Sequence, residues 1–260
     1  MDIEDIKDKI VTAARELAAG EPIAQKVLCD LVFSQTTFAG MLAATLSRQV
    51  SGAIFNREEL EALFLEHFEK KPEILLASAK DLHATVLRDP ACRNYLEPMI
   101  FFKGFQALQI HRVAHVLWED GRTFAAKLLQ SVVSRKLGLD IHPAARIGHG
   151  ILVDHGTNIV IGETATIGNN VSILHGVTLG GTGNEVGDRH PKIASGVMIG
   201  AHAQLLGNIH IGEGAKIGAG AVVVCDVPAH TTFAGVPAVS VGHCSDAMPS
   251  FEMQQDFTRD

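Results

Sequence analysis

The chain has 260 residues, of which 47% are hydrophobic and 20% charged, so its composition suits a packed core and not a disordered chain. A formal net charge of −7 argues against non-specific binding to nucleic acid, which depends on neutralising phosphates. No apolar stretch is long enough to cross a bilayer, and the first residues lack the basic and apolar regions of a signal peptide. Because the four cysteines have no metal or redox spacing, we expect reduced thiols in a cytoplasmic protein with no membrane partner.

Residues 1–138 are predicted to form an α-helical domain. Apolar residues recur there at helical spacing, and glycine or proline separates one helical pattern from the next. The clearest single helix is predicted over residues 98–118. His111 and His115 share one face of this helix, but no third ligand accompanies them, so we expect a polar packing contact there and no metal site.

From residue 139 to about 227, large aliphatic residues recur at every sixth position. They are Ile141, Ile147 and Val153, then Ile161, Ile167, Ile173 and Leu179, and then Ile193, Ile199, Leu205, Ile211, Ile217 and Val223. A period of six fits neither an α-helix nor an alternating strand, and it is typical of a solenoid with one aliphatic residue per edge. We therefore predict a solenoid domain of almost five coils at residues 139–237. The tail at residues 238–260 is expected to be poorly ordered or dependent on a partner.

The first break in this pattern follows Val153, where the phase slips by two residues. His155 lies in the break, and we expect it to face outward from the solenoid wall. A carboxylate that orients an imidazole fixes its tautomer and stabilises its protonated form, so His155 is a candidate general base. Counting along the coils leaves two candidates for the neighbour that orients it. One is Asp140, fifteen residues earlier, and the other is His175, one coil of twenty residues later.

The second break lies between Leu179 and Ile193, which are fourteen residues apart where twelve would keep the phase. The intervening segment, residues 183–191, is rich in glycine and charge and includes Asp188-Arg189-His190. We expect it to leave the coil as a projecting loop, because loops on a rigid scaffold are a common place for binding groups.

Several strings in the chain are more specific than the six-residue period. They are Arg88-Asp89-Pro90-Ala91, Lys103-Gly104-Phe105, Asp140-Ile141-His142-Pro143-Ala144-Ala145, Asp154-His155, Val177-Thr178-Leu179-Gly180-Gly181-Thr182-Gly183 and Gly187-Asp188-Arg189-His190-Pro191-Lys192. Over residues 5–245 the chain resembles the serine acetyltransferases, which begin cysteine synthesis in bacteria and plants. The resemblance implies an α+β fold in which a left-handed parallel β-helix of hexapeptide repeats follows the helical domain, against the usual right-handed crossover preference.

The resemblance also implies a reaction. The hydroxyl of L-serine attacks the thioester carbonyl of acetyl-CoA, giving O-acetyl-L-serine and CoA. The implied site residues are the general base His155, its orienting partner Asp140, Asp89 and Asp154 for the serine ammonium, and Arg189 and His190 for the serine carboxylate. These signs suit a zwitterion, which needs acids on one side and bases on the other.

By the same resemblance, acetyl-CoA lies in a groove between neighbouring subunits, and no metal ion takes part. Its expected contacts are Gly181, Ala201, Lys216 and Ala219. The family forms trimers that pair into hexamers, and cysteine typically competes with serine as a feedback inhibitor. Family members often end in an isoleucine that binds O-acetylserine sulfhydrylase, whereas this sequence ends in aspartate, so we do not expect that partner through the usual contact.

Three other functions are compatible with a solenoid. A hexapeptide-repeat acetyltransferase acting on a sugar or amino-sugar should lack the long helical domain and the string around Asp89. A γ-type carbonic anhydrase needs three imidazoles at a zinc ion, typically including a pair five residues apart, and no two histidines here have that spacing. A non-catalytic assembly scaffold would not require the site residues.

Overall fold

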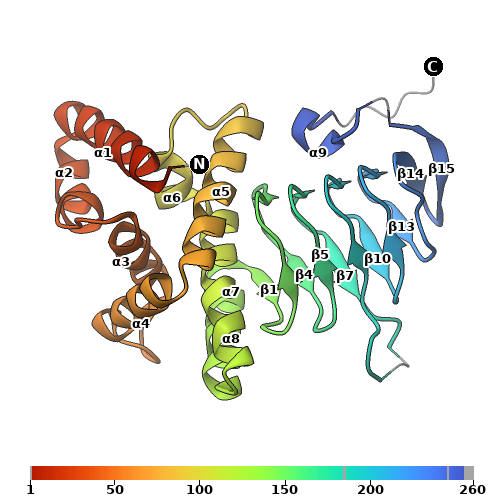
Figure 1. Cartoon of the computed structure of the whole chain (residues 1–260), viewed down its shortest axis with the longest axis horizontal. Coiled ribbons are helices and arrows are strands. Elements are labelled where there is room, and N and C mark those ends of the chain that lie inside the picture. Colours follow the sequence, from red (N-terminus) through yellow and green to blue (C-terminus); the bar gives the residue numbers. More distant parts are fainter. Residues whose placement is uncertain (1, 184–185, 245, 255–260) are drawn as a thin grey trace.

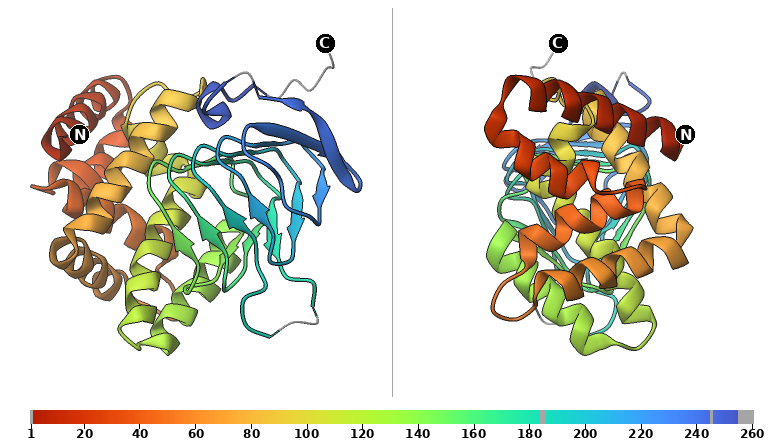
Figure 2. Two further views of the ribbon diagram at one scale, coloured as in Figure 1. Left: turned by 45° about the vertical axis from the view of Figure 1, so that its right-hand side comes forward. Right: turned by 90° about the vertical axis from the view of Figure 1, so that its left-hand side faces the viewer.

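The computed structural model describes residues 2–183, 186–244 and 246–254. Helices form one half of the molecule and a three-sided β-solenoid forms the other, and the two halves lie end to end (Figure 1). Figure 2 shows the helices stacked across one end of the solenoid. Within the described ranges, no helix is both long and apolar enough to cross a membrane.

The helical half consists of α1 (Ile3–Gly20), α2 (Pro22–Leu28), a π-helical turn η1 (Cys29–Phe33), α3 (Phe38–Val50), α4 (Arg57–Lys70), α5 (Pro72–Arg88), α6 (Leu96–Phe101), α7 (Lys103–Glu119) and α8 (Thr123–Leu137). Local sequence explains several of these starts. The side chains of Asp2, Thr37 and Asn56 accept backbone N–H bonds at the starts of α1, α3 and α4. Proline begins α2 and α5, where a missing N–H has no cost.

The single helix predicted over residues 98–118 is wrong as one element. α6 ends at Phe101, the backbone is extended at Phe102 (φ −92°, ψ 101°), and α7 begins at Lys103. The break allows the start of α7 to approach the solenoid closely. A Cβ on Gly104 would overlap the carbonyl oxygen of Val153, so only glycine fits at this contact.

The solenoid is built from three sheets whose strands are contributed in turn by successive coils. The first sheet contains β1 (Leu139–Ile141), β4 (Ile159–Ile161), β7 (Thr178–Gly180), β10 (Gln204–Leu206) and β13 (Val222–Val223). The second sheet contains β2 (Arg146–Ile147), β5 (Thr166–Ile167), β8 (Lys192–Ile193) and β11 (His210–Ile211). The third sheet contains β3 (Leu152–Val153), β6 (Ser172–Ile173), β9 (Met198–Ile199), β12 (Lys216–Ile217), β14 (Thr231–Gly235) and β15 (Ala238–His243). All neighbours are parallel except β14 and β15. This confirms the predicted parallel solenoid of about five turns.

Strand register tests the two predicted breaks. Ile141 pairs with Ile161, so the first coil has twenty residues and the slip of two is confirmed. Ile161 pairs with Leu179, an ordinary coil of eighteen residues. Leu179 pairs with Leu205, twenty-six residues later, so this coil contains eight extra residues and the predicted excess of two is wrong. The reason is that Leu179 and Ile193 lie on consecutive edges, for which the expected spacing is six. Residues 184 and 185 of the predicted loop lie outside the described residues.

Aliphatic residues of the six-residue pattern form a continuous core along the solenoid axis. Leu179 and Leu205 are fully buried, and Ile161 is 3% exposed. One coil cannot bury this face without its neighbours, so the coils stabilise each other as a stack.

A buried ion pair joins the helical half to the first coil. Arg112 of α7 donates from Nη2 to Oδ2 of Asp81 in α5 at 2.6 Å, and also to the carbonyl oxygen of Gly148 at 2.7 Å. The second carboxylate oxygen of Asp81 accepts the backbone N–H of Ile151 at 2.9 Å. These bonds fix both helices to the turn that precedes β3.

The prediction of a poorly ordered tail is wrong for the part that the structure describes. β15 pairs antiparallel with β14, and α9 (Pro249–Glu252) packs beside the solenoid. Ser250 explains part of this docking, because its carbonyl oxygen accepts a bond from the hydroxyl of Ser172 at 2.7 Å. Residues 255–260, on which the sulfhydrylase expectation rests, lie outside the described residues.

Candidate functional site

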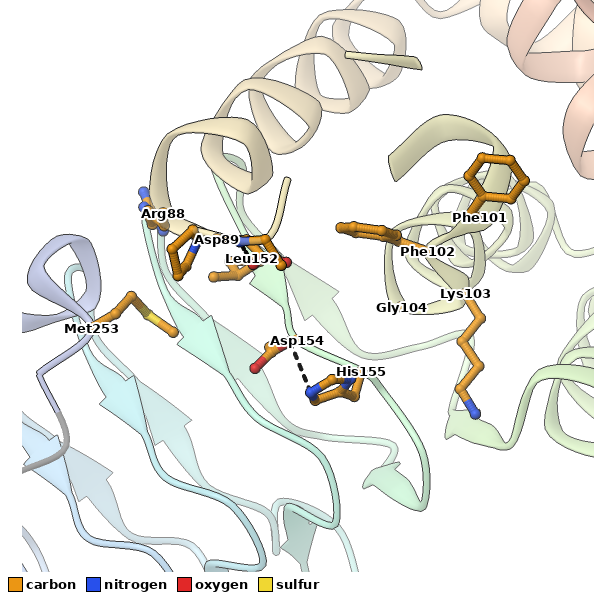
Figure 3. Close-up of a pocket in the computed structure, with 12 residues that line it drawn as sticks. Arg88, Asp89, Phe101, Phe102, Lys103, Gly104, Leu152, Asp154, His155 and Met253 are labelled. Atoms are coloured by element: carbon orange, nitrogen blue, oxygen red, sulfur yellow. Dashed lines mark hydrogen bonds and ion pairs between the residues drawn. The ribbon is translucent and has the colours of Figure 1, made fainter. Parts of the chain in front are cut away.

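A cavity of about 600 Å³ opens where the helical half meets the solenoid (Figure 3). Asp89, Asp154 and His155 all line it, so three of the predicted site residues lie together. Asp89 follows the end of α5, and the other two follow β3. The backbone fixes both positions: the N–H of Asp89 donates to Thr85 in the last turn of α5, and that of Asp154 donates to Ile173 of the next coil.

His155 faces outward, as predicted, and its side chain is 73% exposed. Its backbone has φ of 56°, a left-handed conformation that turns the chain from the third sheet to the first. Its Nε2 lies 3.7 Å from Oδ1 of Asp154, as the dashed line in Figure 3 marks. Burial raises the pKa of the Asp154 carboxyl, whereas a positive charge on His155 lowers it. The pair therefore places a partly buried carboxyl beside an exposed imidazole.

Asp140, the predicted orienting partner, lies in β1, and its Oδ1 accepts a hydrogen bond from Nε2 of Gln130 in α8 at 2.7 Å. In the described part of the chain, no hydrogen bond or ion pair joins Asp140 to His155. The other candidate, His175, does contact His155, with ring centroids 5.6 Å apart. Sequence reasoning missed Gln130, because nothing in a helical pattern indicates which exposed amide meets a strand in the next element.

Arg189 and His190 lie away from this cavity. Arg189 donates from Nη2 to Oε2 of Glu163 at 2.8 Å, and Nδ1 of His190 lies 2.8 Å from the hydroxyl of Thr164. Glu163 and Thr164 line a second cavity of about 840 Å³, which does not include any of the residues that line the first. Burial lowers the pKa of His190, which is only 7% exposed. One chain thus separates the predicted ammonium-binding acids from the predicted carboxylate-binding bases.

Glu163 and Thr164 were also missed from the sequence. The signal was present in the spacing, since Glu163 precedes Arg189 by twenty-six residues, the length of the extended coil. Counting eight inserted residues in place of two would have put this acid next to the arginine.

The predicted CoA contacts are divided among different parts of the solenoid. Ala201 and Ala219 each lie two residues after a paired residue of the third sheet, Ile199 and Ile217, and His155 follows Val153 in the same way. These three positions therefore lie on one corner of the column.

The two other expected CoA contacts are not on that corner. Gly181 follows β7 and lies against Arg189 instead. Lys216 is in β12 and only 8% exposed. Among the described residues, no group of three histidine, cysteine or acidic side chains is arranged to hold a metal ion.

The chain is similar to proteins of known function along nearly its whole length. A family model described as serine acetyltransferase, N-terminal, matches residues 6–110, and one described as bacterial transferase hexapeptide (six repeats) matches residues 190–225. The serine acetyltransferase of Escherichia coli K12 is 46% identical over 256 residues, which cover 98% of this chain and 94% of that protein. The chain belongs to the serine acetyltransferase family. This confirms the predicted acyltransferase class, and the first match covers the helical half that a sugar acetyltransferase should lack.

Solved serine acetyltransferase structures have the same fold. That from Vibrio cholerae has a TM-score of 0.97 and 47% identity, covering 98% of this chain and 99% of its own. The soybean enzyme complexed with serine has a TM-score of 0.89, with 48% identity and coverage of 90% and 97%. A serine acetyltransferase in complex with cysteine has a TM-score of 0.96 and 44% identity, covering 99% of this chain and 100% of its own. The Brucella abortus enzyme in complex with coenzyme A has a TM-score of 0.91 and 41% identity, covering 94% of this chain and 97% of its own.

Proposed function

We propose that this serine O-acetyltransferase uses His155 as the general base for the attack of L-serine on acetyl-CoA. His155 takes the proton from the serine hydroxyl while the serine oxygen bonds to the thioester carbonyl carbon. The tetrahedral intermediate then collapses, the carbon–sulfur bond breaks, and the CoA sulfur takes the proton back from His155. The products are O-acetyl-L-serine and CoA, so the base is regenerated in each turnover.

One observation carries this proposal: an exposed imidazole lines the same cavity as two carboxylates. Asp89 and Asp154 are suited to hold the serine ammonium, which places the neighbouring hydroxyl within reach of the base. Asp140, whose Oδ1 accepts a hydrogen bond from Gln130, is the proposed orienting partner of His155. Ala201 and Ala219 on the same corner are suited to the CoA chain.

Arg189 and His190 belong to the same proposal through a second copy of the chain. Since they bond around the second cavity of their own chain, we propose that they hold the serine carboxylate of a neighbouring subunit. A trimer built along the solenoid would bring these two halves of the site together at each interface.

Cysteine differs from serine only by a thiol in place of the hydroxyl, so the same acids and bases would hold it. We propose that it competes with serine, which agrees with the similar structures bound to serine, to cysteine and to coenzyme A. Cysteine has no hydroxyl oxygen to accept the acetyl group. While cysteine occupies the site, serine cannot bind there, and the enzyme is inhibited.

The replacement His155→Ala tests the proposed base. We expect kcat to fall by about 100- to 10,000-fold, because the base acts in the transition state, while KM for acetyl-CoA stays within about twofold. The measurement is release of free CoA thiol with L-serine as acceptor. The matched control is His210→Ala: His210 also lies 3.7 Å from an aspartate, Asp226, and is 70% exposed, but it does not line the cavity. Near-normal turnover in the His155 variant would remove this residue as the base.

A further inference from the structure

Three histidine rings contact one another along one edge of the solenoid. The ring centroids of His155 and His175 are 5.6 Å apart with an interplanar angle of 75°, and those of His175 and His202 are 4.9 Å apart at 89°. Both contacts are edge-to-face. The mechanism above uses only the first of the three, so the other two histidines have no assigned role.

Strand register explains why these rings meet. His155 and His175 each lie two residues after a residue of the third sheet, Val153 and Ile173, which pair with each other. They therefore occupy equivalent positions one coil apart. His202 belongs to the following coil, and its backbone N–H donates to the carbonyl oxygen of His175 at 2.9 Å.

His202 has a left-handed backbone conformation, which residues with a side chain do not favour. Its φ is 61°. By the backbone hydrogen bonds between coils, the equivalent positions are Asn158, Gly176 and Gly220, with φ of 58°, 72° and 68°. A side chain in this left-handed conformation costs about 1 kcal/mol relative to glycine. The ring of His202 packs over Gly176, where a Cβ would overlap it. Strained positions of this kind are often retained for function.

The contact with His175 restricts a base that is otherwise loosely held. The side chain of His155 is 73% exposed in the single chain, and its Nε2 lies 3.7 Å from Oδ1 of Asp154. An exposed imidazole samples several rotamers, whereas a reacting group must be held within about 0.5 Å of its productive position. Nδ1 of His175 is buried and makes no hydrogen bond, so this ring is not held in place by a polar contact at that atom.

We propose that His175 is a positioning residue for His155, and that His202 fixes the ring of His175 in turn. The inference rests on the proposed role of His155 as the base. In this stack, the ring of His175 limits the rotation of the catalytic imidazole toward the solenoid wall. His202 supports His175 from the next coil, and Gly176 provides the room that this support requires.

The replacement His175→Ala tests the first contact in the full-length enzyme. We expect kcat to fall by about 10- to 100-fold, because misplacing a base by about 1 Å costs this much, while KM for serine and for acetyl-CoA stays within about twofold. His175→Phe restores a flat ring of similar size and should recover most of kcat. An unchanged kcat in the alanine variant, or a phenylalanine variant as slow as alanine, would overturn the inference. A fully active His155→Ala variant would instead remove the proposed function.

A pair of glycine replacements separates positioning from stability. His230 resembles His202 in backbone and packing: its φ is 55°, and its ring packs over Gly214 as that of His202 packs over Gly176. His230 is not in contact with the stack. Both His202→Gly and His230→Gly should keep or raise Tm, because each relieves a left-handed side chain. Only His202→Gly should also lower kcat, by about threefold or more. Equal kcat values for the two variants would contradict a positioning role for His202.

Discussion

The imidazole of His111 lies inside α7, where it is only 5% exposed and its Nδ1 makes no hydrogen bond. Burial lowers its pKa to about 3, with smaller effects from His115 and Arg112. The folded protein therefore keeps this group neutral, whereas the unfolded chain protonates it near pH 6.5. Between these two values the unfolded state binds one more proton, so stability is lost as pH falls from about 6.5 toward 3.

This residue has a measurable effect on acid stability. In His111→Leu the free energy of unfolding should depend less on pH, because the leucine cannot be protonated in the unfolded chain. Between pH 7 and pH 5 the wild type should lose about 2 kcal/mol more unfolding free energy than the variant. Urea unfolding at fixed protein concentration measures it. If the unfolding free energies of the two proteins fell equally with pH, another group would cause the loss of stability in acid.

At the scale of elements, the buried pair Asp81–Arg112 sets the position of α5 and α7 on the first coil. Asp81 is fully buried, and its bond to Ile151 lies just before β3, while α5 ends at Arg88, next to Asp89. The same carboxylate thus links the two elements that carry the acids of the first cavity. A shift at this junction would change the separation of Asp89 and Asp154.

Breaking this pair should be costly. Arg112→Ala leaves a buried carboxylate without its partner, so we expect a loss of about 3–5 kcal/mol in unfolding free energy. The double variant Asp81→Asn, Arg112→Met should recover part of that loss, because it removes the unpaired charge and keeps an acceptor for Ile151. The matched control is Arg57→Ala, which breaks a partly exposed pair with Asp30 and should cost at most about 1 kcal/mol. Equal losses in Arg112→Ala and Arg57→Ala would contradict this account.

For the whole molecule, the two cavities of one chain share no lining residue, so the proposed site would need residues from two chains. Each chain offers the proposed base His155 and two acids in one place and Arg189 with His190 in another. A single chain would then bind only the ammonium side of serine. In the proposed trimer, each interface would combine one cavity of each kind.

Mixed assemblies test this arrangement. His155→Ala and Arg189→Ala chains, each nearly inactive alone at low serine, should regain on the order of a quarter of wild-type activity when co-assembled, because a quarter of interfaces combine two intact halves. The control mixture is His155→Ala with Asp154→Ala, whose defects lie in the same cavity and cannot complement each other. Thiol release after co-expression measures both. No recovery in the first mixture would place the whole site within one chain.

Much of the solenoid could be predicted from its sequence, because one buried aliphatic residue per edge produces a period that no other common element shares. The two-residue slip at His155 followed from the same count. The eight-residue insertion before Ile193 was miscounted, since a six-residue period alone does not identify which edge a residue occupies. The extended residue Phe102 was missed because the feature that accompanies it, the approach of Gly104 to Val153, is a tertiary contact.

The site was predictable as a set of chemical groups but not as an arrangement. An acid next to His155 was visible in the sequence, as were Arg189 and His190 in an inserted segment. The hydrogen bond from Gln130 to Asp140 and the ring contact of His175 depend on how separate elements pack. The ordered part of the tail was missed for a similar reason, because β15 is paired with β14 and this pairing does not follow the six-residue period.

The antiparallel return of β15 along β14 has a consequence for solubility. A stack of parallel coils exposes unpaired backbone groups at its last rung, and another column could add there without limit. The helical half blocks one terminus of the column, while at the opposite terminus the reversed strand covers the third sheet with a partner of the wrong polarity for continued stacking. The segment that carries the chain back from the final coil therefore leaves the third sheet without a parallel edge for a further coil.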